Sequence, residues 1–253
     1  MGELVAQFLA RRKIRVKRVF ETRQPTLEDD IANGSVDVYV DYTGAAYYLK
    51  FHQSHSAPPK TVYDFISREY LALGVVLSKP FPFQSEWAVY VRSGDPKLSK
   101  LKTISELAAF SKNTHKLVIG WPVDFDRDSG AGPKAMIDRY GLKVIPKDIS
   151  IAHLYDALQN KDVEVAVGNS TDGQTLQGKF VRLSDDLQFF PPYEPVILAH
   201  QSTYARKKAF KELFESLSEK LSFDDVRQMN DLAQEHGGAP ADLARTWLDA
   251  HKL

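Results

Sequence analysis

Cysteine is missing from this chain of 253 residues, which excludes disulfide bonds, thiolate metal sites and cysteine nucleophiles. An excess of charge of either sign is also missing, because 33 Lys and Arg residues balance 33 Asp and Glu residues. A chain with no net charge has no overall field to attract nucleic acid or an anionic membrane. We therefore expect a small molecule or another protein as the partner, and no nucleic acid.

An apolar run long enough to span a bilayer is absent from the N-terminal segment. Its basic cluster follows the short apolar run instead of preceding it, so the segment does not read as a signal peptide. The pattern predicts an amphipathic helix over residues 3–12 and then a strand over residues 14–20, where apolar and basic residues alternate. The chain thus begins inside an element, as though an upstream segment had been removed.

The motifs of common enzymes and metal sites are absent as well. There is no G-x-S-x-G, no H-E-x-x-H, no Walker loop, no G-x-G-x-x-G and no EF-hand loop. Asp124, Asp126 and Asp128 imitate the start of a calcium loop, but no glutamate stands at its twelfth position. We therefore expect no catalytic residue, no metal ion and no cofactor.

What is present is a helix-turn-strand pattern that occurs twice, 127 positions apart. Residues 27–44 and residues 154–173 each combine apolar residues spaced four apart, a turn and an alternating strand, and each ends in polar groups. Ligands of open α/β sheets bind beyond the carboxyl ends of the strands. The repeat predicts two similar α/β lobes with a ligand cleft between them, and the alternative is two ordinary α/β units.

Helices alternate with strands up to His200, which predicts mostly parallel sheets. Beyond His200 the pattern changes to amphipathic helices without strands, which is typical of a tail that packs back on one lobe. We assign residues 1–90 and 195–253 to lobe I and residues 91–194 to lobe II. Two strands that cross between the lobes would form a hinge.

Four aromatic residues lie at the ends of predicted elements instead of on apolar stripes: Tyr42, Trp87, Phe125 and Tyr193. Aromatic faces that converge attract quaternary ammonium groups by cation–π interactions of about 0.5–2 kcal/mol per ring. Each ring on its own is more typical of core packing. Their joint placement favours a site for a cationic ligand.

The sequence resembles the substrate-binding proteins of ABC importers for glycine betaine, carnitine and choline. The resemblance covers nearly the whole chain and rests on the segments VDVYVDYTG, PFQSEWAVYVRSGD, DFDRDSG, RYGL, VEVAVGNSTDGQ and LSDDLQFFPPYEPV, in this order. It implies an α/β, two-lobed periplasmic-binding-protein-like fold of type II, no catalysis, and a monomer that delivers its small-molecule ligand to a membrane permease. It also implies a periplasmic or other extracytoplasmic location.

The resemblance implies an aromatic cage, which carries over to Tyr42, Trp87 and Tyr193. Where the family commonly has another cage tyrosine, this chain has Asn169, which removes a ring and adds an amide. Family members also begin with a strand and a loop that this chain lacks. The expected ligand site consists of the cage and the polar groups around it: Tyr42, Thr43, Trp87, Phe125, Arg127, Asn169, Ser170 and Tyr193.

Three rival interpretations remain. The ligand could be a different small amino-acid-like molecule, or the chain could be a sensor domain or a domain fused to a permease. An enzyme on the same fold would use paired aspartates such as Asp124 with Asp126 or Asp185 with Asp186. Paired aspartates usually cap turns, and no positioned histidine or nucleophile accompanies these, so we favour the binding protein.

Overall fold

A computed structural model describes residues 1–19, 24–53, 56–114, 117–123, 132–206 and 210–253. The chain divides into two compact units. Unit 1 comprises Met1–Phe51, Pro58–Gln84 and Tyr193–Leu253, and unit 2 comprises His52–Ala57 and Ser85–Pro192. Strand β3 (Trp87–Arg92) lies entirely in unit 2, whereas the boundary expected at residue 90 falls inside it.

Unit 1 contains a three-stranded sheet in the order β1-β8-β2. Its strands are β1 (Val38–Tyr42), β8 (Pro195–His200) and β2 (Val75–Leu77), and both pairings are antiparallel. The mostly parallel sheet expected here is therefore wrong. Alternation of helix and strand along the chain does not fix the direction of β8, which joins this sheet from far along the sequence.

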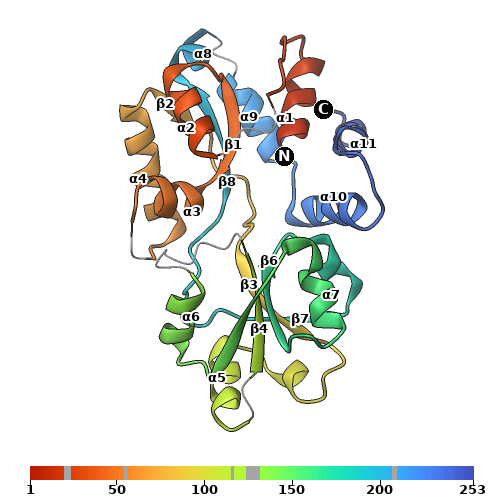
Figure 1. Cartoon of the computed structure of the whole chain (residues 1–253). Helices are drawn as coiled ribbons and strands as arrows, with labels where there is room; N and C mark the ends of the chain where they lie inside the picture. Colours follow the sequence, from red (N-terminus) through yellow and green to blue (C-terminus); the bar gives the residue numbers. More distant parts are fainter. Residues whose placement is uncertain (20–23, 54–55, 115–116, 124–131, 207–209) are drawn as a thin grey trace. The chain divides into compact units, whose positions relative to one another are not determined.

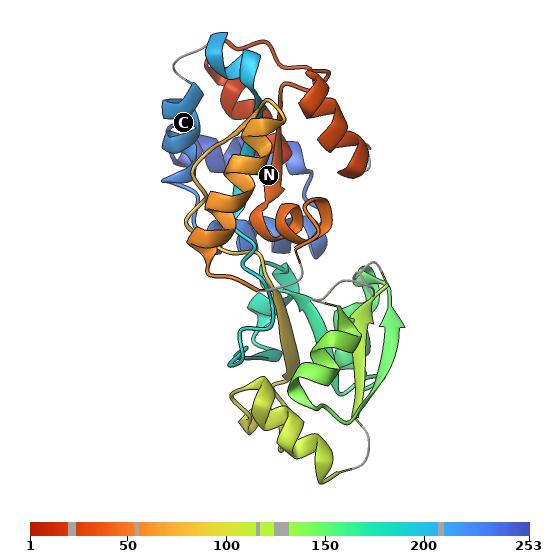
Figure 2. The ribbon, with the colours of Figure 1, turned by 90° about the vertical axis from the view of Figure 1, so that its left-hand side faces the viewer.

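Helices make up the rest of unit 1. They are α1 (Gly2–Arg11), α2 (Gln24–Asn33), α3 (Thr43–Ala45), the π-helical turn η1 (Ala46–Lys50), α4 (Pro59–Ala72), α8 (Gln201–Arg206), α9 (Phe210–Ser218), α10 (Phe223–Gln234) and α11 (Pro240–Ala250). The apolar face of α1 packs with α9, α11 and one face of β8 in a single core. Arg11 donates to the carbonyl of Leu253 at 3.0 Å, so both chain ends lie in unit 1 (Figure 2).

Residues 14–19, which follow α1, do not form a strand. Ile14 and Val16 pack on the core of unit 1, while Lys13, Arg15 and Lys17 are exposed. The strand expected over residues 14–20 is thus wrong for residues 14–19, and residue 20 lies outside the described residues. The alternating pattern correctly indicates which side chains are buried, but it does not indicate whether a neighbouring strand is present to pair with.

Unit 2 contains a five-stranded sheet in the order β5-β4-β6-β3-β7 (Figure 1). With β3, its strands are β4 (Leu117–Pro122), β5 (Val144–Ile149), β6 (Val165–Asn169) and β7 (Phe180–Leu183). Strand β4 is parallel to β5 and β6, whereas β3 is antiparallel to β6 and β7. This sheet is therefore mixed, and the mostly parallel sheet expected from the sequence holds only for β4 with its two neighbours.

Helices cover both faces of the unit 2 sheet. On one face α5 (Ile104–Lys112) and α6 (Pro133–Tyr140) share a core with Val89 and Val167, and on the other α7 (Leu154–Gln159) packs against Ala88 and Tyr90 (Figure 1). The short helices η2 (Leu98–Lys100), η3 (Ile151–His153) and η4 (Gly173–Gln177) complete the unit. Burial on both faces explains the apolar runs in β4 and β6.

The first copy of the repeat is α2 followed by β1. At the end of α2 the amide of Gly34 donates to the carbonyl of Ile31 at 3.3 Å, and the amide of Val36 donates to that of Asp30 at 3.0 Å. Gly34 has a φ of 79°, the left-handed conformation that ends helices. Ile31 is fully buried.

The second copy, α7 followed by β6, makes the same bonds 127 positions later. The amide of Lys161 donates to the carbonyl of Leu158 at 3.4 Å, and that of Val163 donates to Ala157 at 3.3 Å. Lys161 takes the place of the glycine and also has a positive φ, 69°. The expected repeat of helix, turn and strand is confirmed, with matching turns.

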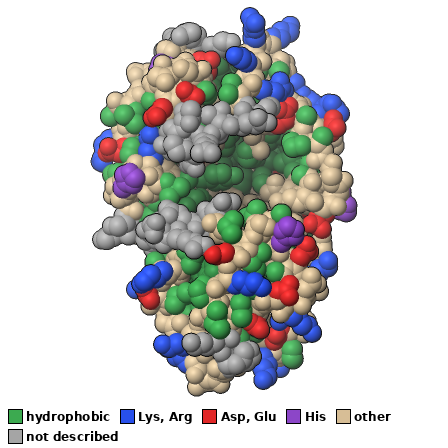
Figure 3. Space-filling model, viewed as in Figure 1, with side chains coloured by type: hydrophobic (Ala, Val, Ile, Leu, Met, Phe, Trp, Pro, Cys, Tyr) green, Lys and Arg blue, Asp and Glu red, His purple; other side chains and the backbone are tan. Residues whose placement is uncertain are grey.

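Charged side chains of both signs are interspersed over the face drawn in Figure 3, as expected for a chain without net charge. No helix in the described parts of the chain is long and apolar enough to cross a membrane. Among the described residues there is also no group of three or more His, Asp or Glu side chains that could hold a metal ion.

Candidate ligand-binding site

Two of the expected aromatic residues meet at the end of β1 in unit 1. Tyr42 is the last residue of β1, and Tyr193 stands two residues before the start of β8. Their ring centroids are 6.5 Å apart and the ring planes are inclined by 47°. Tyr42 lies opposite Pro195 in the ladder, which places Tyr193 diagonally across from it on the same face. Both side chains are half-buried.

Thr43, the residue after β1, is fully buried and ties the two chain segments together. Its amide donates to the carbonyl of Glu194 at 2.9 Å, and its hydroxyl accepts from the amide of Glu194 at 3.0 Å. We call this two-bond contact the unit 1 clamp. Alternation along the strand points the Glu194 side chain away from the tyrosine pair, and burial raises the pKa of that carboxyl.

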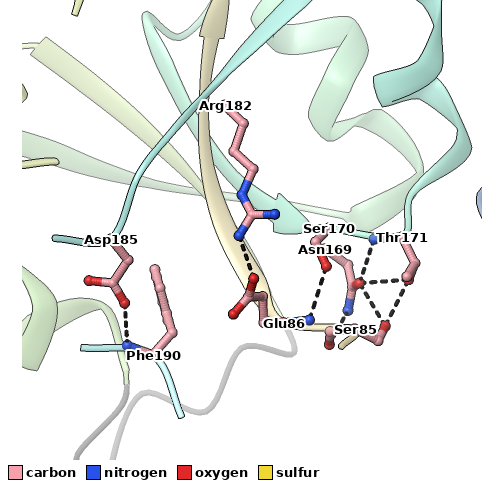
Figure 4. Close-up of polar contacts among 8 residues, drawn as sticks. All are labelled: Ser85, Glu86, Asn169, Ser170, Thr171, Arg182, Asp185 and Phe190. Atoms are coloured by element: carbon pink, nitrogen blue, oxygen red, sulfur yellow. Dashed lines mark hydrogen bonds and ion pairs between the residues drawn. The ribbon is translucent and has the colours of Figure 1, made fainter. Parts of the chain in front are cut away.

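The end of β6 in unit 2 carries an equivalent contact, which we call the unit 2 clamp. The amide of Ser170 donates to the carbonyl of Glu86 at 2.8 Å, and the Ser170 hydroxyl accepts from the amide of Glu86 at 3.1 Å (Figure 4). Ser170 stands 127 positions after Thr43, and Glu86 directly precedes β3 as Glu194 directly precedes β8. The repeat therefore extends to the bonds at the strand ends.

The positions that hold rings in unit 1 hold a polar network in unit 2. Asn169, in the slot of Tyr42, accepts through Oδ1 from the Ser85 hydroxyl at 2.9 Å and from the amide and hydroxyl of Thr171 at 3.0 and 2.8 Å (Figure 4). Its Nδ2 donates to the carbonyl of Ser85 at 3.3 Å. The Asn169 oxygen thus accepts three hydrogen bonds from within the protein.

Trp87 lies opposite Asn169 in the β3–β6 ladder and packs partly against the core on the α5 face. It is half-buried, so one part of its indole serves the core. Trp87, Asn169 and Ser170 therefore belong to unit 2, and Tyr42, Thr43 and Tyr193 to unit 1.

The loop that follows β6 is ordered by Asp172. Its Oδ2 accepts from the Tyr155 hydroxyl and from the amide of Asn169, both at 2.8 Å. Gly168 makes this possible, because a Cβ at that position would lie 2.2 Å from the Tyr155 hydroxyl. Burial raises the pKa of Asp172, and the two donated bonds oppose the rise. Asp172 thus orders its own loop.

Of the carboxylates considered for acid–base work, Asp185 and Asp186 have structural partners, whereas Asp124 and Asp126 lie outside the described residues. Asp185 accepts from the amides of Phe189 and Phe190 at 3.0 and 2.8 Å, and Asp186 accepts from the amide of Ser105 at 3.1 Å. The Glu86 side chain forms an ion pair with Arg182 (Figure 4). These groups hold turns and strands together.

Phe125 and Arg127, also expected in the site, lie outside the described residues. The sequence interpretation missed Ser85, Thr171 and the backbone of Glu86 and Glu194. A signal was present, because S-E-W-A-V and Y-E-P-V-I both place a glutamate before an apolar strand. The similarity of the two segments is hidden in the sequence, because β8 follows its partner β1 along the chain whereas β3 precedes its partner β6.

Comparison with known proteins shows the family to which this chain belongs. Residues 1–250 match the family described as the substrate binding domain of ABC-type glycine betaine transport systems. The chain is similar to a glycine-betaine-binding protein of Pseudomonas aeruginosa, with 25% identity over 99% of this chain and 83% of that protein. A carnitine transport binding protein of Listeria monocytogenes is 28% identical over 66% of this chain, and the match spans only 54% of that protein.

Solved structures show the same fold. A crystal structure of a glycine betaine/carnitine/choline ABC transporter protein matches with a TM-score of 0.84 at 23% identity, and the match covers 99% of this chain and 93% of that one. The chain thus has a known two-lobed binding-protein fold. The chain is a member of the family of substrate-binding domains of ABC-type glycine betaine transport systems.

Proposed function

We propose that this chain binds a small quaternary-ammonium or related zwitterionic solute of the glycine betaine, choline and carnitine class. The observation that carries the proposal is the Tyr42–Tyr193 pair at the end of β1, with centroids 6.5 Å apart. Two tilted rings at this spacing offer their electron-rich faces to one cationic group. The names of the relatives support the same class of ligand.

The rings supply attraction without a formal charge. A quaternary ammonium group has no hydrogen to donate, so a carboxylate gives it no directional bond, whereas a π-face binds its diffuse charge. Thr43 belongs to the proposed site beside Tyr42, and its hydroxyl oxygen accepts from the amide of Glu194. We also propose Asn169 and Ser170, at the equivalent strand end of unit 2, as polar ligand contacts.

Titration calorimetry with glycine betaine, choline and carnitine tests the proposal. A neutral analogue of choline, in which carbon replaces the ammonium nitrogen, is the matched control for the charge. We expect measurable heat with at least one cation and at least tenfold weaker binding of the neutral analogue, because a cation–π contact is worth about 0.5–2 kcal/mol per ring. Absence of binding to all three cations would reject this ligand class.

The tyrosines themselves are tested by matched substitutions. Tyr193→Ala should weaken binding about tenfold by removing one ring, whereas Tyr193→Phe should retain most of the affinity because it keeps the π-face. Tyr140→Phe in unit 2 controls for loss of a tyrosine elsewhere; its hydroxyl serves Asp185. Equal affinity of the alanine and phenylalanine variants at position 193 would remove the ring from the site.

The remaining parts of the proposal concern the setting. As the solute-binding part of a transport system, the domain acts outside the cytoplasm, as a monomer, and hands its ligand to a membrane permease. Catalysis is not part of the proposal, since Asp185 and Asp186 are engaged with backbone amides. Sedimentation of the purified protein with and without ligand tests the monomer.

A further inference from the structure

The two clamps lead to an inference about how the tyrosine pair is held. We propose that Thr43 is a positioning residue, which fixes Tyr193 against Tyr42 by binding the backbone of Glu194. The inference rests on the proposed function only in its consequence for affinity. The ring geometry itself can be measured without any ligand.

The backbone at the end of β1 explains why a hydroxyl is needed. In a regular antiparallel ladder the amide of Glu194 would donate to the carbonyl of Thr43. That carbonyl accepts instead from the amide of Ala46, because Thr43 begins helix α3. The Thr43 hydroxyl takes over as acceptor at 3.0 Å. The ladder thereby gains one more bond at the point where the chain turns away into a helix.

The extra bond acts directly on the ring pair. Glu194 is joined to Tyr193 by one peptide bond, and the residue that follows is Pro195, which has no amide hydrogen to donate. The two bonds between Thr43 and Glu194 therefore hold the chain segment that carries the Tyr193 ring. Without the hydroxyl, the Glu194 amide would lose this acceptor, and the segment would be held less firmly beside Tyr42.

The unit 2 clamp has the same pair of hydrogen bonds but lies beside different side chains. Ser170 holds Glu86 through the same pair of bonds, at 2.8 and 3.1 Å, and the residue before Glu86 is Ser85, which bonds to Asn169. In each unit a buried hydroxyl thus fixes the residue that faces the strand end. Recurrence at equivalent positions of two separate sheets argues that the hydroxyl belongs to the framework of the site.

The experiment uses three variants of the whole chain labelled with fluorotyrosine. Thr43→Val removes the hydroxyl at nearly constant volume, Thr43→Ser restores it, and Ser170→Ala removes the equivalent hydroxyl in unit 2. Fluorine NMR without ligand reports the surroundings of Tyr42 and Tyr193, whose signals are assigned from Tyr42→Phe and Tyr193→Phe. Dissociation constants for glycine betaine, choline and carnitine are measured alongside.

We expect both signals to shift in Thr43→Val, to return in Thr43→Ser, and to stay unchanged in Ser170→Ala. Affinity should fall about fivefold in Thr43→Val and recover to within about twofold in Thr43→Ser, the loss expected when one hydrogen bond is removed. If the valine variant does not fold, Thr43→Ala leaves room for water at the Glu194 amide and should show the same shift.

Unmoved signals in a folded variant without the hydroxyl would overturn the proposal, as would an equal shift in Ser170→Ala, which would mean a global effect. Failure of the two proposals can be told apart. Shifted signals without binding of any quaternary ammonium ion would leave Thr43 as a positioning residue and reject the proposed ligand. Unmoved signals together with binding that is equally strong with and without the hydroxyl would reject Thr43 as a positioning residue and retain the proposed ligand.

Discussion

The ends of β1 and β6 share one backbone framework and differ in chemistry. Each strand follows a helix with the same turn, and each ends at a buried hydroxyl that clamps a glutamate backbone. Between these matching bonds the chain places two rings at Tyr42 and Tyr193, but an amide and a hydroxyl at Asn169 and Ser85. Bonds to the backbone preserve the geometry, so the side chains at the strand ends are free to differ.

The two copies also differ in how their turns are supported. The turn after α2 relies on local bonds, including one from the Ser35 amide to the side chain of Asn33 at 2.9 Å. The turn after α7 is held from a distance by Arg92, which donates to the carbonyls of Leu158 and Val163 at 2.8 and 2.7 Å. Strand β1 is an edge strand, while β6 lies between β4 and β3.

The largest effect is expected from Arg92. The Arg92→Met variant should lose about 3 kcal/mol of unfolding free energy, because it leaves two carbonyls and Asp95 without their partner inside unit 2. Urea unfolding followed by tryptophan fluorescence measures the loss. Arg68→Met is the control, since that side chain is exposed and should cost less than about 0.5 kcal/mol. A similar loss in both variants would mean that the turn does not depend on Arg92.

Asp172 should give the second largest effect. Asp172→Ala leaves the buried Tyr155 hydroxyl without its acceptor and should cost about 2 kcal/mol. Asp172→Asn keeps an oxygen for both donors and should be at least as stable as the wild type at pH 7. Unfolding by urea at pH 4 and pH 7 compares the three proteins.

The sign of the pH dependence follows from the direction of the pKa shift. Burial raises the pKa of Asp172 in the folded protein above its unfolded value, so the folded state holds the proton more tightly. This contribution to stability is present at low pH and is lost as the pH rises through the folded pKa. The Asp172→Asn variant should lack this decline, and an unchanged pH profile would contradict the assignment.

The third largest effect is expected from a substitution that gives the end of β1 the residue found at the end of β6. Tyr42→Asn replaces one ring of the pair by an amide and should weaken binding of a quaternary ammonium solute about tenfold, or about 1.4 kcal/mol. Tyr42→Phe retains the ring and should bind within about threefold of the wild type. Calorimetry measures both. Equal losses would show that the hydroxyl, and not the π-face, matters at this position.

Much of the framework could be predicted from the sequence, because it depends on local signals. Pro133 stands in the first turn of α6 and Gly141 ends it, and Ser222 caps α10, all of which are local signals. The repeat was visible because helix end, turn and strand follow one another along the chain. Strand direction was not visible, since β3 and β8 pair with strands that are distant in sequence.

The site was only partly predictable for the same reason. Tyr42 and Tyr193 were expected from their positions at element ends, and the structure brings their rings together. The roles of Thr43 and Ser170 as clamps depend on backbone atoms of Glu194 and Glu86, which no local pattern identifies as their partners. Hydrogen bonds between paired strands can be predicted only when the register of the two strands is known.

The smallest effect concerns the residue that distinguishes the two turns. Lys161 holds a left-handed φ of 69° where the first copy has Gly34, and a residue with a Cβ pays about 1 kcal/mol for this conformation. Glycine removes that strain but has more freedom to lose on folding. Lys161→Gly should therefore stabilise the protein by up to about 0.5 kcal/mol, a rise of up to about 2 °C in Tm. Lys161→Ala keeps the strain and should give no rise.

The reverse change, Gly34→Ala, should cost about 1 kcal/mol from the backbone alone, because its added Cβ would lie at ordinary contact distance, 3.5 Å, from the His200 ring. The melting temperatures of Lys161→Ala and Lys161→Gly are compared with that of the wild type. An equal rise in both variants would show that loss of the lysine side chain, and not the backbone conformation, causes the difference between the turns.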